Sequence, residues 1–428
     1  MAKSLVIQAS FSALKAAASR GSNRRMVVLG EVSMPSAVFA NLPTTIFEEM
    51  SGLARESGAV NLGQGFPDAP GPLFVRQKAA DAVLNGYNQY PPMAGLPELR
   101  QAVARHYNAR QGLDLDWQSE VTITSGATEA LAAAFLALVE PGDEVVMFQP
   151  VYDAYAPIVR RAGGVPVMVS LQPPAFRWDR TMLEAVFTPR TKVVALNNPL
   201  NPAAIVYSPE DLALLAEFCV RFDAIAVCDE VWEEVVFDGA AHTPLLGVAG
   251  MRERCVKIGS AGKMFGLTGW KVGFLCAAPA LTHVLAKTHQ FLTFTTPPNL
   301  QVAVAHGLDN GEDWFVAMTA DLEASRDRLT SALTAEGFAV LPSQGTYFLN
   351  IDLPGSGIAL PDRAFALHAV REAGVASIPV SAFYETDPVT TVLRLCFPKA
   401  EATLDEGVRR LARARELATR LDPSRAGD

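Results

Sequence analysis

Asp229 and Lys263 are the residues whose surroundings in the sequence point most clearly to chemistry. Asp229 follows the apolar run 224–228, where a carboxylate must be paired or hydrogen-bonded to a cationic group. Lys263 lies among small and apolar residues in the segment 260–264, and desolvation in such a setting lowers the pKa of an amine. An amine with a lowered pKa is a nucleophile that can form a Schiff base with a carbonyl group. Lys263 is therefore a candidate nucleophile, whereas a cap of a helix or turn is the alternative role for Asp229.

A turn of small residues, Ser125-Gly126-Ala127, separates a predicted strand at 121–124 from a predicted helix. The free backbone N–H groups near Ala127 and Thr128, together with the positive end of the helix dipole, would form a pocket for an anion such as a phosphate. Many helices begin after such a turn. The turn alone is therefore a weak signal for phosphate binding.

These segments lie within an alternation of predicted strands and helices. The clearest helix is 209–222, where Ser208 can act as N-cap and Pro209 takes the first helical position. Strands that are almost continuously apolar and alternate with helices predict a mostly parallel sheet buried on both faces. Such sheets bind ligands at the carboxyl ends of their strands. The predicted strands are 145–148, 165–171, 193–197, 224–230 and 255–260.

The pattern changes after about residue 308, where long predicted helices are accompanied by isolated strands. We therefore predict an extension over 1–33, an N-terminal arm over 34–62, a large domain over 63–308 and a smaller α+β domain over 309–428. The helices predicted in the last region are 321–336, 361–372 and 403–421, and the strands are 346–351 and 392–397.

The composition limits the classes of ligand. The chain has 428 residues, of which 50% are hydrophobic and 19% charged, and its formal net charge is −9. This composition indicates a packed body rather than a disordered or collagen-like chain. An acidic chain without a stripe of Lys and Arg is not expected to bind nucleic acid, and no apolar stretch is long enough to span a bilayer. The five cysteines form no CxxC pair and the six histidines show no ligand spacing, so no metal is expected and the ligand is expected to be a small molecule.

The N-terminal segment differs in composition from the rest of the chain. Residues 1–30 contain five Lys and Arg, five Ser and no acidic residue. This composition resembles that of a mitochondrial transit peptide. The alternatives are a disordered extension or a start assigned too early, with Met34 as the true beginning. We expect a cytoplasmic protein, or a mitochondrial matrix protein if the segment is a transit peptide.

Several motifs taken together resemble the class I/II aminotransferases of fold type I, which depend on pyridoxal phosphate. The similarity is greatest to the kynurenine, glutamine and methionine aminotransferase branch and to bacterial N-succinyl-diaminopimelate aminotransferases. It implies a mostly parallel, seven-stranded type of sheet sandwiched by helices, plus a smaller α+β domain. The motifs are 61-NLGQGFPD-68, 88-NQYPP-92, Ser125-Gly126-Ala127, 150-PVYDAY-155, 197-NNPLNP-202, 229-DEVW-232, 260-SAGK-263, 269-GWK-271, 378-IPVSAFY-384 and 394-RLCF-397.

The resemblance implies catalytic and substrate-binding roles. Lys263 would hold the cofactor as a Schiff base and then act as the general base at the substrate Cα. Asp229 would pair with the pyridine nitrogen and keep it protonated. Arg394 would grip the substrate α-carboxylate with its bidentate fork, assisted by Asn201, and Gly65 would let the backbone approach that carboxylate. A structural ion pair is the alternative role for Arg394.

The resemblance also implies a set of cofactor contacts. Tyr152 would stack on the ring and Asn201 would hydrogen-bond the 3′ oxygen. Tyr90 would reach the phosphate across the interface of a homodimer with shared active sites. Packing roles are the alternatives for Tyr152 and Tyr90, and a surface position is the alternative for Lys271. The remaining phosphate ligands would be Ala127, Thr128, Ser260 and Lys271.

Two positions depart from the family pattern. Trp232 stands where most relatives have a Tyr that supports the 3′ oxygen of the cofactor. Because an indole N–H can donate a hydrogen bond but cannot accept one or ionise, we expect a changed pKa of the Schiff base and a changed pH optimum. Ala204 replaces the Gly that usually follows the Asn-Pro pair. Neither change removes the nucleophile or the carboxylate, so activity is expected.

The predicted activity is the transfer of an amino group from an L-amino acid to a 2-oxo acid in ping-pong half-reactions. The expected lining of the pocket favours an aromatic or sulfur-containing donor, and no second arginine for a distal carboxylate is evident. The alternatives are an N-succinyl-diaminopimelate aminotransferase of lysine biosynthesis and a cysteine-conjugate β-lyase. A regulator built on this fold would need a DNA-binding domain, for which the basic segment is too short. The residues expected to line the pocket are Phe66, Tyr152, Phe294 and Tyr384.

Overall fold

The computed structural model describes residues 36–40 and 42–419. The chain divides into an N-terminal unit that ends at Leu42 and a body from Pro43 onward. Helix α2 (Ala37–Ala40) belongs to the first unit. The predicted extension over 1–33 lies outside the described residues. No helix in the described ranges is long and apolar enough to cross a membrane.

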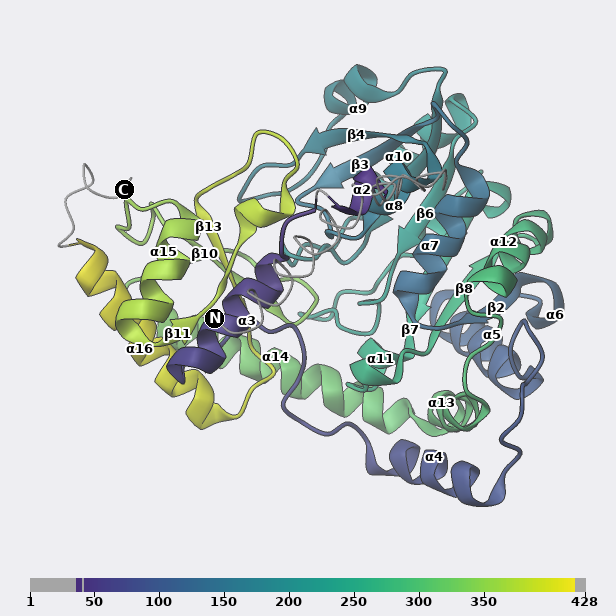
Figure 1. The fold of residues 1–428 in the computed structure, drawn as a ribbon, viewed down its shortest axis with the longest axis horizontal. Helices are drawn as coiled ribbons and strands as arrows, with labels where there is room; N and C mark the ends of the chain where they lie inside the picture. The colour runs from purple at the N-terminus through teal and green to yellow at the C-terminus, as the bar shows by residue number, and fades with distance from the viewer. Residues whose placement is uncertain (1–35, 41, 420–428) are drawn as a thin grey trace, which may run out of the picture. The chain divides into compact units, whose positions relative to one another are not determined.

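A seven-stranded sheet forms the centre of the body (Figure 1). Its order is β2-β8-β7-β6-β5-β3-β4, and β8 alone runs antiparallel to its neighbours. The predicted mostly parallel sheet is thereby confirmed. The strands are β2 (Val121–Thr124), β3 (Glu144–Gln149), β4 (Val165–Ser170), β5 (Thr191–Asn197), β6 (Ile225–Asp229), β7 (Cys255–Ser260) and β8 (Gly273–Ala277).

Helices cover both faces of this sheet because the side chains of each strand alternate between two apolar cores. In β3, Val146 and Phe148 pack on one side, whereas Val145 and Met147 pack on the other. Helices α4 (Leu73–Asn85), α5 (Pro97–Gln111), α10 (Pro209–Arg221) and α13 (Pro298–Asn310) cover the first side. Helices α7 (Ala127–Leu138), α8 (Tyr155–Ala162) and α12 (Pro279–Leu292) cover the second. The shorter helices are α6 (Trp117–Glu120), α9 (Arg180–Val186), α11 (Ala261–Met264) and the 3-10 turns η2 (Leu245–Gly247), η3 (Arg252–Arg254) and η4 (Thr268–Trp270).

The N-cap predicted for the helix at 209–222 is present in α10. The Ser208 side chain accepts a hydrogen bond from the Asp211 N–H, and the Asp211 side chain accepts one from the Ser208 N–H. Pro209 is the first helical residue. This reciprocal capping box satisfies two backbone donors and fixes where the helix begins.

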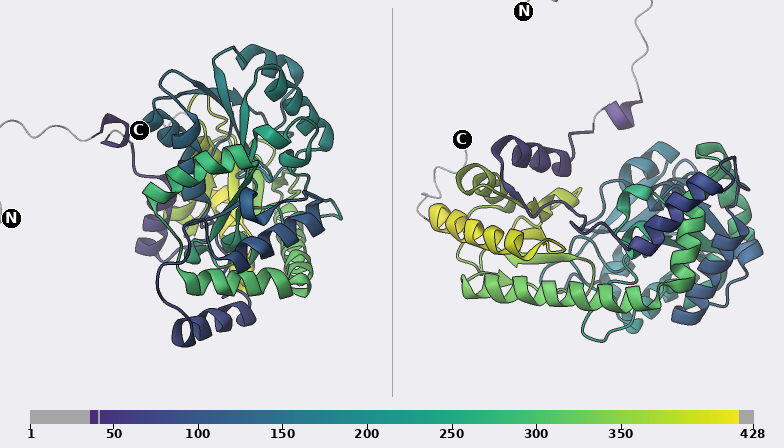
Figure 2. Two further views of the ribbon diagram at one scale, coloured as in Figure 1. Left: turned by 90° about the vertical axis from the view of Figure 1, so that its right-hand side faces the viewer. Right: turned by 90° about the horizontal axis from the view of Figure 1, so that it is seen from below.

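A four-stranded antiparallel sheet, in the order β12-β13-β10-β9, forms a second layer with its own core. The N-terminal strand β1 (Val60–Asn61) pairs with β11 (Val375–Ala376), so residues from both ends of the body share this core. The long helix α14 runs between the region of α13 and this layer (Figure 2). The remaining elements are α3 (Ile46–Ser57), β9 (Ala339–Val340), β10 (Phe348–Asp352), α14 (Glu312–Ala335), α15 (Asp362–His368), β12 (Ile378–Pro379), the 3-10 turn η6 (Val380–Phe383), β13 (Val392–Cys396) and α16 (Glu401–Thr419).

Some predicted boundaries in this region were wrong. The helix expected from residue 321 already begins at Glu312, where two acidic residues in the first turn complement the helix dipole. The helix expected over 361–372 turns π-helical at Ala369–Ala373. The strand expected from residue 346 begins at Phe348, because Thr346 has a φ of 66°, which is incompatible with a strand.

Candidate active site

A cavity of about 200 Å³ lies at the carboxyl ends of the sheet strands. It gathers most of the residues that the sequence predicts for a site, although they come from separate elements. Parallel strands all end at one edge of the sheet, which explains why distant segments meet there. The lining residues are Gly126, Ala127, Thr128, Leu131, Tyr152, Asn197, Asn201, Asp229, Val231, Trp232, Ser260, Lys263, Thr268 and Lys271.

Asp229 is the last residue of β6 and is buried. Its carboxylate accepts a hydrogen bond from the Tyr155 hydroxyl at 2.5 Å. Burial raises the pKa of Asp229 to about 6, although the Tyr155 hydrogen bond and the charge of Lys263 oppose the shift. The carboxylate therefore gains most from a ligand that brings a positive charge or an N–H donor to it.

Lys263 lies in the short helix α11, which directly follows β7. Its Nζ donates to the Tyr347 hydroxyl at 3.2 Å and lies 4.5 Å from the centre of the Trp232 ring. Burial lowers the pKa of Lys263 to about 8. The neutral, nucleophilic form of this amine is therefore more populated near neutral pH than in an ordinary lysine, as the sequence predicts.

The beginning of helix α7 forms a cationic corner of the cavity. Gly126 precedes the helix with a φ of 78° and offers no side-chain cap, so the first N–H groups of α7 have no partner from the cap. A Cβ at Gly126 would lie 3.2 Å from Lys271 Cε, which shows how closely this lysine packs against the turn. Together with Ser260, these groups suit an anion.

Arg394 projects from β13 and is 1% exposed. It donates to Asn201 Oδ1 at 2.8 Å and to the Gly63 carbonyl at 3.1 Å, and it lies over the Phe348 ring at 3.9 Å. No carboxylate among the described residues forms an ion pair with it, and its Nε has no partner there. Burial lowers its pKa to about 10. A buried guanidinium without a counter-ion favours the binding of an anionic ligand, and the geometry argues against the alternative of a structural ion pair.

Three other residues predicted for the site or its pocket, Gly65, Tyr90 and Tyr384, do not line this cavity. Gly65 is needed for close packing, because a Cβ there would lie 3.2 Å from Phe348 Cζ. Tyr90 is 80% exposed, does not line the cavity in this chain and packs its ring against Phe294. Tyr384 donates its hydroxyl to the Leu171 carbonyl, which leaves only its ring for a ligand.

Comparison with known proteins identifies the family. Residues 57–411 match the family described as aminotransferase class I and II. The chain belongs to this family. It is 44% identical over 380 residues to the probable N-succinyldiaminopimelate aminotransferase of Mycobacterium tuberculosis, covering 86% of this chain and 96% of that protein. It is 40% identical over 379 residues to the methionine aminotransferase of Escherichia coli, covering 88% and 98%. The solved N-succinyldiaminopimelate aminotransferase of M. tuberculosis superimposes with a TM-score of 0.86 at 43% identity, covering 89% of this chain and all of that one.

The aminotransferase therefore has the family and fold type that the sequence motifs predict. Its site also contains residues for which the sequence motifs imply no individual role. Tyr155 bonds to Asp229, and Asn197 joins the backbone of Asp229 to that of Asn201. Tyr155 ends the motif 150–155 and Asn197 begins the motif 197–202. Their positions in these motifs were the features of the sequence that could have indicated a role at the site. Tyr347 and Thr268 had no such signal, because nothing local distinguishes them from packing residues.

Trp232 is buried in this aminotransferase and stands with its ring edge-on to that of Tyr347, with the ring centres 4.3 Å apart. The Tyr347 hydroxyl faces Lys263. A tyrosine hydroxyl is thus present beside the lysine even though position 232 itself supplies an indole.

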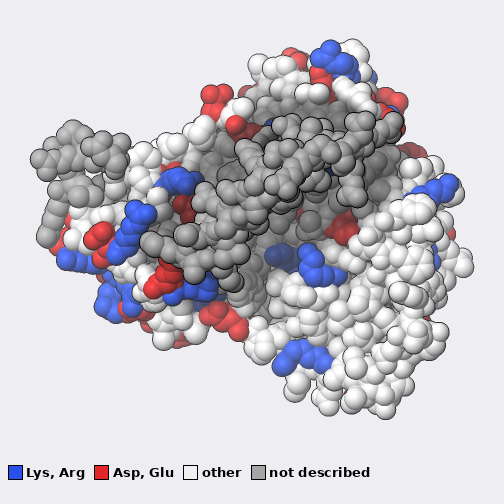
Figure 3. Space-filling model, in the orientation of Figure 1, with Lys and Arg blue, Asp and Glu red and all other residues white. Residues whose placement is uncertain are grey.

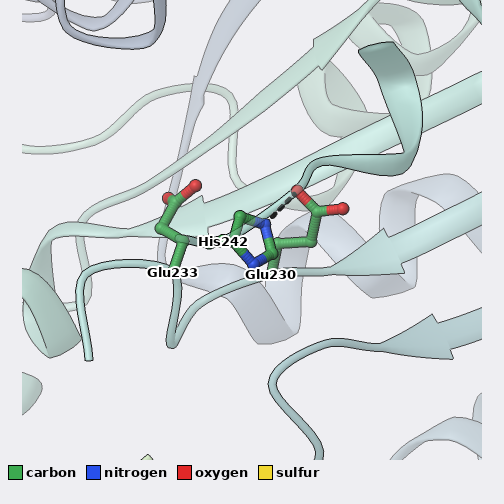
Figure 4. Close-up of side chains that lie close together, drawn as sticks. All are labelled: Glu230, Glu233 and His242. Atoms are coloured by element: carbon green, nitrogen blue, oxygen red, sulfur yellow. Dashed lines mark hydrogen bonds and ion pairs between the residues drawn. The ribbon is translucent and has the colours of Figure 1, made fainter. Parts of the chain in front are cut away.

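A buried ion-pair network includes Glu230, the residue that follows Asp229 in the sequence, and Figure 4 shows three of its members. This network includes three side chains that lie close enough to share an ion, namely Glu230, Glu233 and His242. His242 Nε2 lies 3.2 Å from Glu230 Oε2, within hydrogen-bonding distance. However, the Lys257 ammonium donates to both carboxylates. Although burial opposes the shift, Lys257 and His242 lower the pKa of Glu230 to about 2. Since a cation already occupies the space between the carboxylates, we interpret the cluster as structural.

Proposed function

We propose that this aminotransferase uses pyridoxal phosphate to move an amino group from an L-amino acid to a 2-oxo acid. One observation supports this proposal above the others. The Lys263 amine and the Asp229 carboxylate line one cavity. The Arg394 guanidinium, which forms no ion pair with any described residue, donates to Asn201 at the edge of that cavity.

The residues at the site fit the cofactor. The cationic corner at the start of α7 suits a phosphate, and the buried Asp229 suits a ring N–H. Lys263 would form the covalent link, Tyr152 would stack on the ring and Asn201 would bond the 3′ oxygen. The residues that would hold the phosphate are Ala127, Thr128, Ser260 and Lys271.

When bound, pyridoxal phosphate supplies a carbonyl group for amine exchange and a ring that withdraws electrons. The protein supplies the proton transfers and the positions. In its neutral form the Lys263 amine would take a proton from the substrate Cα and deliver it to the carbon of the cofactor that keeps the amino group. Asp229 would stabilise a positive charge at the ring nitrogen of the bound cofactor, and Arg394 would fix the substrate through its α-carboxylate.

For the amino donor, we propose an amino acid with an aromatic or sulfur-containing side chain. Trp232, Tyr152 and Phe348 give the region an aromatic character. The cations that line the cavity are Lys263 and Lys271. Because Lys263 is assigned to the covalent link and Lys271 to the phosphate, neither is left to bind a distal carboxylate of the donor. The methionine aminotransferase of E. coli is a relative consistent with this choice. The second candidate is N-succinyl-diaminopimelate transamination, which is favoured by the 44% identity to the mycobacterial protein.

A panel of amino donors and oxo-acid acceptors, analysed by mass spectrometry, separates these candidates. We expect amino transfer from methionine and aromatic amino acids to exceed that from glutamate. Faster turnover of glutamate with N-succinyl-2-amino-6-oxopimelate would instead support the second candidate. Release of pyruvate and ammonia from cysteine conjugates, without an acceptor, would reveal β-lyase activity. Absence of transamination with every pair would contradict the proposed function.

Replacing Arg394 by lysine is expected to weaken donor binding. Lysine keeps the charge but cannot form the bidentate fork, so KM for the donor should rise by about 10- to 100-fold. Steady-state kinetics with the best donor of the panel would measure this change. The control is Arg328→Lys, an exposed arginine paired with Asp405; equal effects of the two changes would argue against a carboxylate-binding role for Arg394.

We also propose a homodimer that completes the site. The face over α4 and α13 has few charged side chains (Figure 3). Large apolar residues exposed at the ends of α4 and α12 include Leu84 at 79%, Tyr87 at 75%, Tyr90 at 80% and Phe291 at 86%. The Tyr90 ring, in the segment after α4, contacts the Phe294 ring just after α12, so the ends of the two helices lie together. Exposed apolar groups there mark an interaction surface, and a second copy would bring its Tyr90 to the phosphate. Sedimentation should give twice the mass of the chain, and Phe291→Glu should shift the protein toward monomer; a monomeric, fully active wild type would contradict the proposal.

A further inference from the structure

A chain of hydrogen bonds links the catalytic lysine to the substrate-binding arginine. Lys263 Nζ donates to the Tyr347 hydroxyl at 3.2 Å, and that hydroxyl donates to the Gly65 carbonyl at 2.5 Å. Two residues earlier in the chain, the Gly63 carbonyl accepts a bond from Arg394 at 3.1 Å. One tyrosine and a three-residue backbone segment thus connect the group that moves the proton with the group that holds the carboxylate.

The directions of these bonds follow from the chemistry of Tyr347. Its side chain is buried, and burial raises its pKa well above the ordinary value, so the phenol stays protonated. A phenol has one proton to donate. That proton is used on the Gly65 carbonyl, so the phenol oxygen is left to accept from Lys263. Accepting one amine proton restricts the direction in which the amine's lone pair can point.

The ring and the backbone segment are both held firmly. Trp232 and Phe348 pack edge-on against the Tyr347 ring, with centre distances of 4.3 and 5.0 Å. A Cβ at Gly63 would lie 3.1 Å from Ile378 Cδ1, so the segment 63–65 has little room to move. A shift at one end of the chain of bonds is therefore transmitted to the other, because packed groups do not deform independently.

We propose that Tyr347 is a positioning residue that orients the Lys263 amine and ties its position to the segment 63–65 that Arg394 contacts. This proposal rests on the proposed function in one respect, namely that Lys263 acts as the base. It predicts two effects of Tyr347→Phe, one on the free amine and one on proton transfer.

The first experiment measures the amine in the apoenzyme. Competitive labelling with acetic anhydride across a range of pH, followed by peptide mass spectrometry, gives the pKa of Lys263. Loss of an acceptor disfavours the ammonium form, so Tyr347→Phe should lower this pKa by about 0.5 to 1 unit. The charged and titratable groups that also act on Lys263, namely Cys396, Asp229, Arg394 and Lys271, stay in place in this variant.

The second experiment measures the half-reaction with the holoenzyme. Single-turnover rates at saturating donor should fall by about 10- to 100-fold in Tyr347→Phe, because a misdirected base loses its alignment with the substrate Cα. KM for the donor should rise much less, since Arg394 remains. The dissociation constant of an unreactive carboxylate, 3-phenylpropionate, should rise by about two- to fivefold through the looser segment 63–65.

Tyr207→Phe is the matched control. Tyr207 is also a buried tyrosine, but its hydroxyl has no hydrogen-bond partner among the described residues and it lies outside the cavity. This variant should keep the wild-type Lys263 pKa and half-reaction rate.

The proposal is overturned if Tyr347→Phe leaves both the Lys263 pKa and the single-turnover rate unchanged. It is also overturned if Tyr207→Phe lowers the rate equally, because the effect would then be one of general packing. The labelling experiment needs no cofactor. An enzyme that failed to transaminate would contradict the proposed function, yet the pKa comparison would still test the hydrogen bond.

Discussion

Lys263→Ala is expected to abolish transamination, with a loss in kcat on the order of 10⁵- to 10⁶-fold. The variant removes the amine that lines the cavity just after β7, and with it both the covalent link and the base. Lys271 also lines the cavity but packs against the turn at Gly126. It is therefore held in the cationic corner and is not expected to replace Lys263.

Two measurements test this expectation. The wild-type holoenzyme should absorb visible light, and the band should fade when an amino donor is added, whereas Lys263→Ala should show no covalent attachment after borohydride reduction. The control is Lys192→Ala, an exposed lysine on β5, which should behave as the wild type. Normal turnover by Lys263→Ala would contradict the role of Lys263 as covalent link and base.

Asp229→Asn is expected to lower kcat by about 10³-fold, because a neutral amide no longer stabilises a protonated ring nitrogen as charge develops. The geometry should survive, since an amide oxygen can still accept the bond from Tyr155. Kinetics with the same donor measure the loss. Asp223→Asn, an exposed carboxylate bonded to Arg254, is the control and should be unaffected.

The same change should have the opposite effect on the stability of the apoenzyme. Burial raises the pKa of Asp229 from 3.8 to about 6. Its contribution to stability is therefore fully present below pH 3.8 and is lost as the pH rises through about 6, a loss of about 2 to 3 kcal/mol. Apo Asp229→Asn should accordingly exceed the wild type in free energy of unfolding by up to about 2 to 3 kcal/mol at pH 8. This advantage should shrink as the pH is lowered toward 4, and denaturant titrations at the two pH values measure it. Equal stability of the two proteins at pH 8 would contradict the raised pKa.

The two expected results have a common cause. The chain carries a formal net charge of −9, yet the cavity and its edge hold Lys263, Lys271 and a buried Arg394. The acidic residue at the site, Asp229, is costly to ionise without a ligand. Both features favour binding of an anionic ligand that also presents an N–H group to Asp229. The same buried charges lower the stability of the apoenzyme, because no ligand compensates for them there.

Local patterns were sufficient for much of the fold and for the central residues of the site. Apolar runs rich in β-branched residues predicted the strands of the large sheet except β8, and Ser208 and Pro209 predicted the beginning of α10, because capping and burial depend on neighbours in the sequence. Lys263 and Asp229 stood out for the same reason, since Asp229 ends one apolar strand and Lys263 lies in the short turn after another. The beginning of α14 and the π-helical turn after His368 were missed, because packing rather than local propensity determines them.

The amino-acid sequence by itself thus determined the alternating architecture and the family, and it singled out Lys263 and Asp229 as candidate reactive residues. Tertiary structure alone decided which distant side chains support those residues. Tyr155 bonds to Asp229 across 74 positions of the chain, and Tyr347 bonds to Lys263 across 84. It also left Arg394 without a carboxylate partner among the described residues, a condition that no spacing in the sequence can indicate. The physical reason is that hydrogen bonding and desolvation depend on distances of a few ångströms in space, and only the folded chain sets those distances between residues that are remote in the sequence.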